Sequence, residues 1–309
     1  MSMKKILTGI LAVAALSGIQ AFAQDDAPEM ESKVYTGLKP SEISVNTQFK
    51  SRYLSDGRVI NPEYMLFGSA TLGWNLKDTE DFCDGLYIGI WGANDLNRYN
   101  AGSGIKYEPE EFDYYIGYWY TLKLESDNFE NLNFDLSYTY WDYPSRTGWE
   151  YVGSQQNTIA LDINTGIKNE KLDTLKPGVT INWDPENEKY YANIYIKAAD
   201  TIWTKDDEDE KKKQTLGWNS SVELMWGNSH YVDAAFLDVD GTNDIHKNTF
   251  TTLTWKAGLD YSPMKNVSVG PFVQLSFALD HECRDSWKLD DNSKSGVNNL
   301  WGFGASFKF

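Results

Sequence analysis

The sequence predicts an all-β fold, a transmembrane antiparallel up-and-down β-barrel of about 12 strands, with about 14 as the alternative. Three observations support this prediction. Apolar and aromatic residues occupy every second position over most of the chain, which is the period of a strand with one apolar face. Trp and Tyr stand near both ends of several of these stripes, as they do at membrane interfaces. No segment shows a helical period over about a dozen residues.

The first residues have the pattern of a secretory signal peptide. Lys4 and Lys5 precede an apolar stretch at 6–16, and the small-residue site Ala21-Phe22-Ala23 follows. That stretch is too short for a membrane-spanning helix, which needs about 20 apolar residues. We therefore expect a signal peptide over 1–23, a periplasmic N-terminal segment over 24–41 and the barrel over 42–309.

Composition agrees with a barrel and excludes one class of partner. The chain has 12 Trp, 19 Tyr, 14 Phe and 24 Gly but only 9 Pro, a mixture that suits pleated strands and tight turns. Its formal net charge is −17. Because a nucleic acid requires a basic surface, the sequence predicts no nucleic-acid partner.

Thirteen stretches of the chain alternate in this way. They lie at residues 42–54, 62–75, 86–95, 111–124, 132–143, 157–167, 177–183, 189–199, 215–226, 230–239, 249–261, 267–280 and 299–309. Single-chain bacterial barrels have an even number of strands and keep both termini in the periplasm. The odd number means that one stretch is not a strand, that one stretch contains two strands, or that one strand was missed. We favour twelve strands. The weakest patterns are the short 177–183 and 147–153, which would add a strand.

The medium that meets the apolar face separates two kinds of barrel. A soluble barrel encloses its apolar face, whereas an outer-membrane barrel turns it toward lipid. Tyr64 and Trp74 bracket one stripe. At ~3.3 Å per residue and a tilt near 40°, this stripe rises roughly 25 Å, which is the height of a lipid-facing band. We therefore predict an outer-membrane barrel of a Gram-negative-type bacterium, with a soluble periplasmic β protein as the alternative.

Charged residues on the polar face are expected to point into the lumen. By strand parity they include Lys50, Arg52, Asp113, Lys123, Asp135, Glu223, Lys256 and Asp260. Basic and acidic residues balance in this row, so the acidic excess must lie in loops and turns. These charges either line a hydrated path or pair and close it, because burying them unpaired would be costly.

The chain ends on a row of aromatic residues. Trp301, Phe303, Phe307 and Phe309 stand at alternate positions of the last stretch. This row resembles the recognition segment that outer-membrane barrels present to their assembly machinery. We expect it to join the lipid-facing wall, which makes the barrel assembly machinery, outer-membrane lipid and lipopolysaccharide the expected partners.

Loop lengths predict which connections face outward, because external loops are long and periplasmic turns short. The long connections are 200–214, 240–248 and 281–298, and the short ones are 184–189, 227–229 and 262–266. The charge run 205–213 then lies in an external loop, where a solvated loop is favoured over a cation-binding one. Counting from the first strand places 76–85 in the periplasm, so Cys83 and Cys283 lie on opposite sides of the membrane and cannot bond.

Residue types that carry catalysis or bind metals form no convincing group. The three histidines, His230, His246 and His281, complete no evident nucleophile arrangement, although His281 has acidic neighbours. The segment 238–244 has the composition of a calcium loop but not its spacing, so a hairpin turn is favoured. We expect neither an enzyme, nor a cofactor, nor a metal site.

Three stretches resemble an uncharacterised outer-membrane β-barrel family labelled Gcw_chp. They are SRYLSDGR at 51–58, GLYIGIWGAN at 85–94 and DYYIGY at 113–118. The resemblance implies the location and the fold but no site residues. The expected function is that of a porin-like channel for passive diffusion of small hydrophilic solutes. The alternative is a non-conducting structural or surface-binding barrel with acidic external loops.

Overall fold

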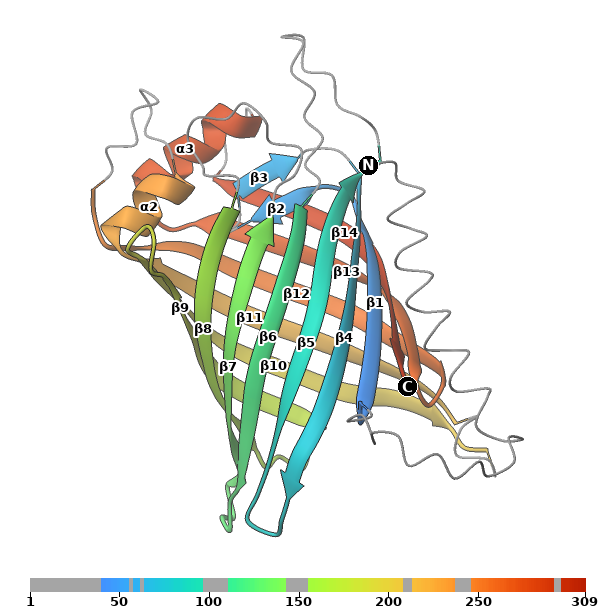
Figure 1. Ribbon diagram of the computed structural model, residues 1–309. Coiled ribbons are helices and arrows are strands. Elements are labelled where there is room, and N and C mark those ends of the chain that lie inside the picture. Colours follow the sequence, from blue (N-terminus) through green and yellow to red (C-terminus); the bar gives the residue numbers. More distant parts are fainter. Residues whose placement is uncertain are drawn as a thin grey trace, which may run out of the picture.

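The computed structural model describes residues 40–55, 58–61, 64–96, 111–142, 155–207, 213–236, 246–291 and 296–309. The signal peptide predicted over 1–23 and nearly all of the segment predicted over 24–41 lie outside these residues. Twelve antiparallel strands close into a single barrel (Figure 1), which confirms the predicted fold and strand number. Closure gives every barrel strand a hydrogen-bonded neighbour on each side and leaves no free edge.

Each barrel strand pairs with its neighbours in sequence, and β1 closes the circle between β14 and β4. The barrel strands are β1 (Glu42–Lys50), β4 (Met65–Asp78), β5 (Phe82–Asp95), β6 (Glu111–Lys123), β7 (Phe129–Asp142), β8 (Gln155–Ile167), β9 (Thr174–Asp184), β10 (Lys189–Lys205), β11 (Gln214–Gly227), β12 (Thr249–Met264), β13 (Val267–Ala278) and β14 (Val297–Lys308).

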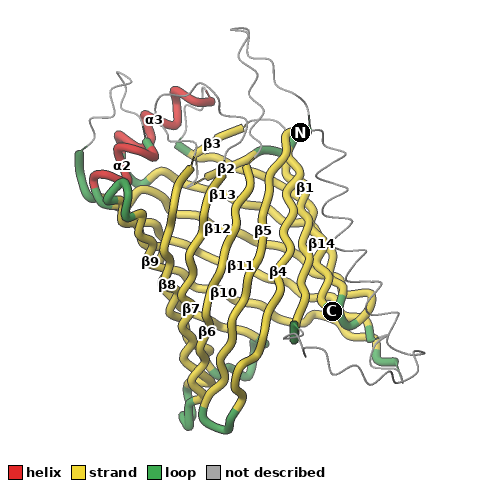
Figure 2. Tube along the Cα trace, in the orientation of Figure 1, coloured by secondary structure: helices red, strands yellow, loops and turns green. Residues whose placement is uncertain are grey.

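The two ends of the barrel differ. β1 begins and β14 finishes at the same end, since Ser44 pairs with Lys308; we call this the terminal end. The connections 79–81, 124–128, 168–173 and 265–266 join strands there, and the last residue of β10 and the first of β11 lie there too. The opposite end, which we call the mouth end, carries the other ends of the strands and all of the helices within the described residues (Figure 2).

Four short elements lie at the mouth end (Figure 1). β2 (Tyr53–Ser55) and β3 (Arg58–Asn61) form a hairpin between β1 and β4. α2 (Ser229–Ala235) lies between β11 and β12, and α3 (His281–Asp291) lies between β13 and β14. The predicted stretch 42–54 is therefore two strands, and the stretch 230–239 is wrong as a strand because its first residues form α2. Asn228 caps that helix by accepting a hydrogen bond from the Tyr231 backbone at 2.9 Å.

The predicted strand at 230–239 would cross the barrel, but α2 does not. The connections before it were therefore assigned to the wrong end of the barrel. The turn 185–188 and residue 228 lie at the mouth end, although their short length predicted the periplasmic side. Residues 208–212 of the charge run lie outside the described residues, but the strand ends that flank the run, Lys205 and Gln214, pair at the terminal end and not at the mouth end. The connections after β12 lie as predicted, because no spurious strand intervenes there.

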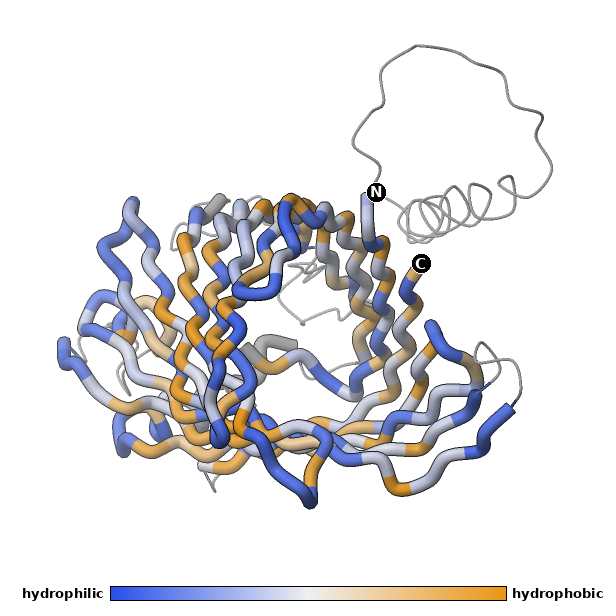
Figure 3. The backbone as a smooth tube through the Cα atoms, turned by 90° about the horizontal axis from the view of Figure 1, so that it is seen from below, coloured by the Kyte–Doolittle hydropathy of each residue, from blue (hydrophilic) through white to orange (hydrophobic). Residues whose placement is uncertain are grey.

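The outside of the barrel is apolar. In Figure 3 hydrophobic and hydrophilic residues alternate along the strands. Large exposed side chains on the outer face include Leu86, Ile88, Ile90, Tyr114, Ile116, Tyr118, Leu136, Ile181, Ile194, Ile196, Val222, Trp255, Val273, Trp301 and Phe303. A soluble barrel would enclose this set, so the exposed apolar wall identifies a membrane-spanning barrel. In the part of the chain that the structure describes, no helix has the length and hydropathy to span a bilayer.

Candidate functional site

The inner wall holds a polar cavity of about 370 Å³. β1 and β11–β14 form it, and its polar lining residues are Asn46, Thr47, Gln48, Lys50, Asn219, Lys256, Asp260, Ser268, Gln274 and Ser306. Three of the charged residues predicted to face the lumen, Lys50, Lys256 and Asp260, are therefore brought together here. Amide, hydroxyl and charged groups on one surface of a cavity favour water inside it.

Charges on this wall are partly matched. The ammonium group of Lys256 lies 2.9 and 2.8 Å from the two carboxylate oxygens of Glu223. Asp260 accepts hydrogen bonds from Asn219 and, at 3.4 Å, from the Ser268 hydroxyl. Lys50 places its ammonium group 4.2 Å from the centre of the Phe67 ring. Lys256 therefore has a carboxylate partner, whereas Lys50 has none among the described residues.

The opposite wall, on β7 and β8, carries two carboxylates. Asp135 accepts a hydrogen bond from the Tyr87 hydroxyl at 2.6 Å. Asp162 accepts from Tyr195 at 2.9 Å and from Thr180 and Asn164 at 2.5 Å each. No basic side chain among the described residues pairs with either carboxylate, so hydrogen bonds and not ion pairs hold this wall. Parity predicted the position of Asp135 but not the tyrosines that hold both carboxylates.

Aromatic rings on the inner wall lie flat over glycines of the adjacent strand. A Cβ atom at Gly117 would lie 2.2 Å from the Tyr87 ring, and one at Gly178 would lie 2.5 Å from Tyr195. The same relation joins Tyr115 to Gly89, Trp119 to Gly85 and Phe272 to Gly302. Because glycine has no side chain, each ring can rest against the backbone of the wall and not project toward the barrel axis.

The β2–β3 hairpin folds against the inside of β4–β6 at the mouth end. Tyr53 packs edge-on against Phe67 at 5.3 Å between ring centres and donates its hydroxyl to Glu111 at 2.9 Å. Met65, Phe67 and Ala93 are buried beneath it. Arg52, predicted to face the lumen from a strand, lies half-buried in the segment between β1 and β2.

The two helices form a second cluster at the mouth. Tyr231, Val232 and Phe236 at α2 pack with Cys283 and Trp287 of α3 over Met225 of β11. α3 also lies against β3. We call α2, α3 and the β2–β3 hairpin together the mouth cap. It covers part of the mouth end (Figure 1), which the sequence analysis did not foresee.

An ion-pair group ties the mouth cap to the chain before β12. Lys247 contacts Asp280 at 2.8 Å and also pairs with Glu282. Burial disfavours both charges, but the hydrogen bonds and opposite charges outweigh it. The pKa of Asp280 is therefore below its ordinary range and the pKa of Lys247 is above its own. Burial raises the pKa of the nearby Cys283 thiol to about 12.

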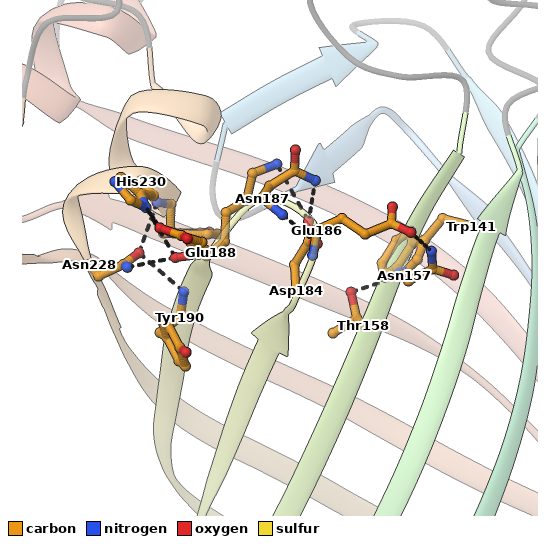
Figure 4. Close-up of polar contacts among 12 residues, drawn as sticks. Trp141, Asn157, Thr158, Asp184, Glu186, Asn187, Glu188, Tyr190, Asn228 and His230 are labelled. Carbon is orange, nitrogen blue, oxygen red and sulfur yellow. Dashed lines mark hydrogen bonds and ion pairs between the residues drawn. The ribbon is translucent and has the colours of Figure 1, made fainter.

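Polar contacts at the rim connect α2 to β8 and to the turn 185–188 (Figure 4). The Asn157 amide donates to Glu186 at 2.8 Å, and the Asn228 amide donates to the Glu188 carbonyl at 2.9 Å. His230 lies 3.3 Å from the same carbonyl through Nδ1. This network fixes the start of α2 on the barrel wall.

The remaining predicted residues lie apart from the cavity. Asp113 is on the inner face of β6 but buried, and Lys123 pairs with Asp78 at 2.9 Å at the terminal end. Trp301, Phe303 and Phe309 are exposed, whereas Phe307 is partly buried. Cys83 and Cys283 are free thiols at opposite ends of the barrel.

All three histidines have a carboxylate contact, and His230 lies 3.7 Å from Glu188 of the turn 185–188. His246 Nδ1 lies 2.6 Å from Asp233 of α2, whose other oxygen accepts the His246 backbone N–H at 2.7 Å. His281, at the start of α3, lies 3.7 Å from Glu282. His246 and His281 are at the mouth end, where loop position predicted them.

No protein-family model matches the chain, so the resemblance to the Gcw_chp family is not confirmed, and no curated protein matches it in sequence. Solved structures with a similar fold include LpxR from Salmonella typhimurium (9% identity, 86% of this chain and 99% of that chain, TM-score 0.49). Others are an outer membrane channel from Pseudomonas putida F1 (10%, 91% and 100%, 0.44) and outer membrane phospholipase A from Escherichia coli (11%, 90% and 94%, 0.41). The conclusion that this chain is a twelve-stranded membrane-spanning barrel therefore rests on its own closed sheet and apolar outer wall.

Proposed function

We propose that the protein is a channel of the bacterial outer membrane that lets small hydrophilic solutes diffuse passively. The observation that carries the proposal is the polar cavity inside a barrel whose outer wall is apolar. Water and polar solutes have a low free energy in such a lumen, whereas the lipid around the barrel excludes them. The predicted signal peptide would deliver the chain across the inner membrane.

The path for solutes runs between the two charged walls. Lys50, Lys256 and Asp260 line one side, and Asp135 stands on the other. The flat rings over glycines keep bulky side chains against the wall, which leaves the space along the axis to water. The mouth cap restricts the size of the solute. Passage needs no chemical step, so the proposed role includes neither catalysis nor a cofactor.

The outer surface supports the proposed membrane partners. Trp301 and Phe303 on β14 stand in the exposed apolar wall, where lipid acyl chains would cover them. The same alternate row is the segment we propose for recognition by the barrel assembly machinery. Lipopolysaccharide would surround the barrel at the mouth end.

A second candidate is a non-conducting structural barrel, and the mouth cap favours it. A cap packed through buried Phe236 and Trp287 would close the mouth if it stayed docked. The ion pair of Lys256 with Glu223 would then act as an internal brace. This candidate does not include binding at the cell surface through the charge run 205–213, because the strand ends that flank the run, Lys205 and Gln214, lie at the terminal end.

Liposome swelling separates the two candidates. Refolded protein is reconstituted into vesicles, which are diluted into isotonic solutions of uncharged sugars of increasing size. The channel predicts swelling that is fast for a monosaccharide and slower for each larger sugar. Vesicles that contain the folded barrel but swell no faster than empty vesicles would exclude the channel and favour the structural barrel.

A further inference from the structure

Lys50 and Asp260 line the same cavity, and neither forms an ion pair with any of the described residues. The ammonium group of Lys50 lies 4.2 Å from the centre of the Phe67 ring. A ring face orients an ammonium group but does not neutralise it. The Asp260 carboxylate accepts hydrogen bonds from Asn219 and Ser268, and neither donor carries a positive charge. The cavity therefore presents one cation and one anion that a bound solute could pair with.

Lys256, the third charged residue of the lining, already has a partner. Its ammonium group lies 2.8 Å from Glu223, which is outside the lining. Lys50 is thus the cation of this cavity that remains available, and Asp260 is the anion. Charges that are partly removed from bulk water are stabilised by solute groups of opposite charge.

The register keeps these two charges apart. Lys50 of β1 pairs with Gly302 of β14, Gly302 pairs with Phe272 of β13, and Phe272 pairs with Gly258 of β12. Lys50 is therefore level with Gly258, and Asp260 lies two residues closer to the terminal end. Three strand spacings of about 4.8 Å separate the two backbones by roughly 14 Å along the wall. Side-chain length and wall curvature shorten this gap without closing it.

Three glycines leave space along this part of the wall. Gly258, Gly270 and Gly304 line the cavity, which has a volume of about 370 Å³. A Cβ atom at Gly304 would meet its nearest atoms at 3.6 Å, an ordinary contact, so no aromatic ring covers this position. The space is large enough for a small ligand.

We propose that the cavity binds a short peptide in its zwitterionic form, with the peptide carboxylate at Lys50 and the peptide ammonium group at Asp260. The proposal rests on the proposed channel and names the class of solute that the channel would favour. An extended dipeptide spans about 7 Å. In a single amino acid both charged groups are attached to one carbon atom, which is too close to reach both residues. Gln48 and Gln274 also line the cavity and offer amide groups to the peptide bond.

The first experiment measures the affinity of refolded protein in detergent for dialanine by saturation-transfer NMR. N-acetyl-dialanine lacks the ammonium group, and dialanine amide lacks the carboxylate. Dialanine should bind about tenfold more tightly than either derivative, because each derivative loses one charged contact. Lys50→Gln should bind dialanine and its amide equally, and Asp260→Asn should bind dialanine and its N-acetyl derivative equally. Lys123→Gln is the matched control, since Lys123 pairs with Asp78 outside the cavity, and it should keep the preference.

The second experiment fills the cavity. Gly304→Leu places a side chain in the open space and should abolish dialanine binding, while the variant still folds because the new Cβ atom makes only ordinary contacts. Gly73→Leu is the control, because Gly73 is outside the lining and its Cβ atom would meet the nearest atom at 3.8 Å. Heat-modifiable migration in gel electrophoresis verifies that both variants are folded.

Equal affinity of the wild type for dialanine and its two derivatives would overturn the proposal. So would dialanine binding that Lys50→Gln and Asp260→Asn leave unchanged, or that folded Gly304→Leu retains. Binding is measured without any flux across a membrane. A barrel that binds dialanine but does not swell vesicles would therefore exclude the channel and keep the site, whereas swelling without binding would exclude the site alone.

Discussion

Tyr87 reaches across a whole strand to hold Asp135. Tyr87 belongs to β5 and Asp135 to β7, and the tyrosine hydroxyl donates to the carboxylate at 2.6 Å. The strand between them presents Gly117, which pairs with Tyr87 in the register. The ring crosses the wall where β6 has no side chain. Three strands of the acidic wall are thereby tied together by one side chain.

Gly117→Ala should break this arrangement. The new methyl group would lie 2.2 Å from the Tyr87 ring, so the ring must leave the wall and lose its bond to Asp135. We expect the free energy of unfolding to fall by about 1–3 kcal/mol, measured by urea titration in lipid vesicles. Gly73→Ala is the control, because its methyl group meets the nearest atoms at 3.8 Å. Equal stability of the two variants would contradict the role of Gly117.

The lipid-facing wall makes a separate prediction. Ile116 is 52% exposed on the outer face of β6, whereas Gln48 of β1 lines the cavity. Ile116→Lys places a charge in hydrocarbon and should lower the free energy of unfolding in vesicles by about 2–4 kcal/mol. Gln48→Lys places the same charge in water and should cost far less. A reversed order would mean that the polar face is the outer one.

Docking of the mouth cap should depend on Lys247. Removing its charge in Lys247→Gln leaves Asp280 and Glu282 without their cation, so α3 should open more often. Cys283 reports this opening, because its thiol is buried in the cluster. In a Cys83→Ser background, the variant should react with a dipyridyl disulfide several times faster than its parent. Lys265→Gln, in an exposed turn at the terminal end, should react at the parental rate.

The same contacts predict a pH range for docking. The pKa of Asp280 is lowered, so its contribution is complete above about pH 4 and is lost as the pH falls through the lowered value. The pKa of Lys247 is raised, so its contribution is complete below about pH 10 and is lost as the pH rises through the raised value. Trp287 should therefore be protected from acrylamide quenching between these limits. Quenching that does not change below pH 4 would count against the ion-pair group.

The acidic wall predicts a preference for cations. Asp135 and Asp162 have no basic partner among the described residues, whereas Lys256 is neutralised by Glu223. Asp135→Asn should lower the permeability ratio of K⁺ to Cl⁻, measured as the reversal potential across a salt gradient. Asp127→Asn, in an exposed turn at the terminal end, should change it little. An unchanged ratio in Asp135→Asn would exclude this wall from the path.

The sequence contains most of the information about the barrel wall but little about the mouth. Alternating apolar and polar residues indicate a strand when one face meets lipid and the other meets water. The barrel strands can therefore be predicted from the sequence. Val232, Ala234 and Phe236 also stand at every second position, and this pattern predicted a strand where α2 lies. A seven-residue helix is too short to show its own period.

The alternation of apolar and polar residues does not predict which side chains touch between strands. Parity places Asp135 on the inner face, but only the register brings Tyr87 of β5 within hydrogen-bonding distance of it. Loop length failed for 185–188 because a short turn can join strands at either end of a barrel. The mouth cap depends on contacts between helices and a hairpin that are far apart in sequence. The local periodicity of apolar residues does not indicate such contacts.

Single-channel current across a planar bilayer tests the proposed channel most directly. Purified, refolded protein should produce discrete conductance steps. In a background without Cys83 and Cys283, Lys256→Cys should give steps that a bulky thiol reagent makes smaller, because Lys256 lines the cavity. Folded protein that inserts into the bilayer but gives no steps would contradict the account, and so would steps that the reagent leaves unchanged.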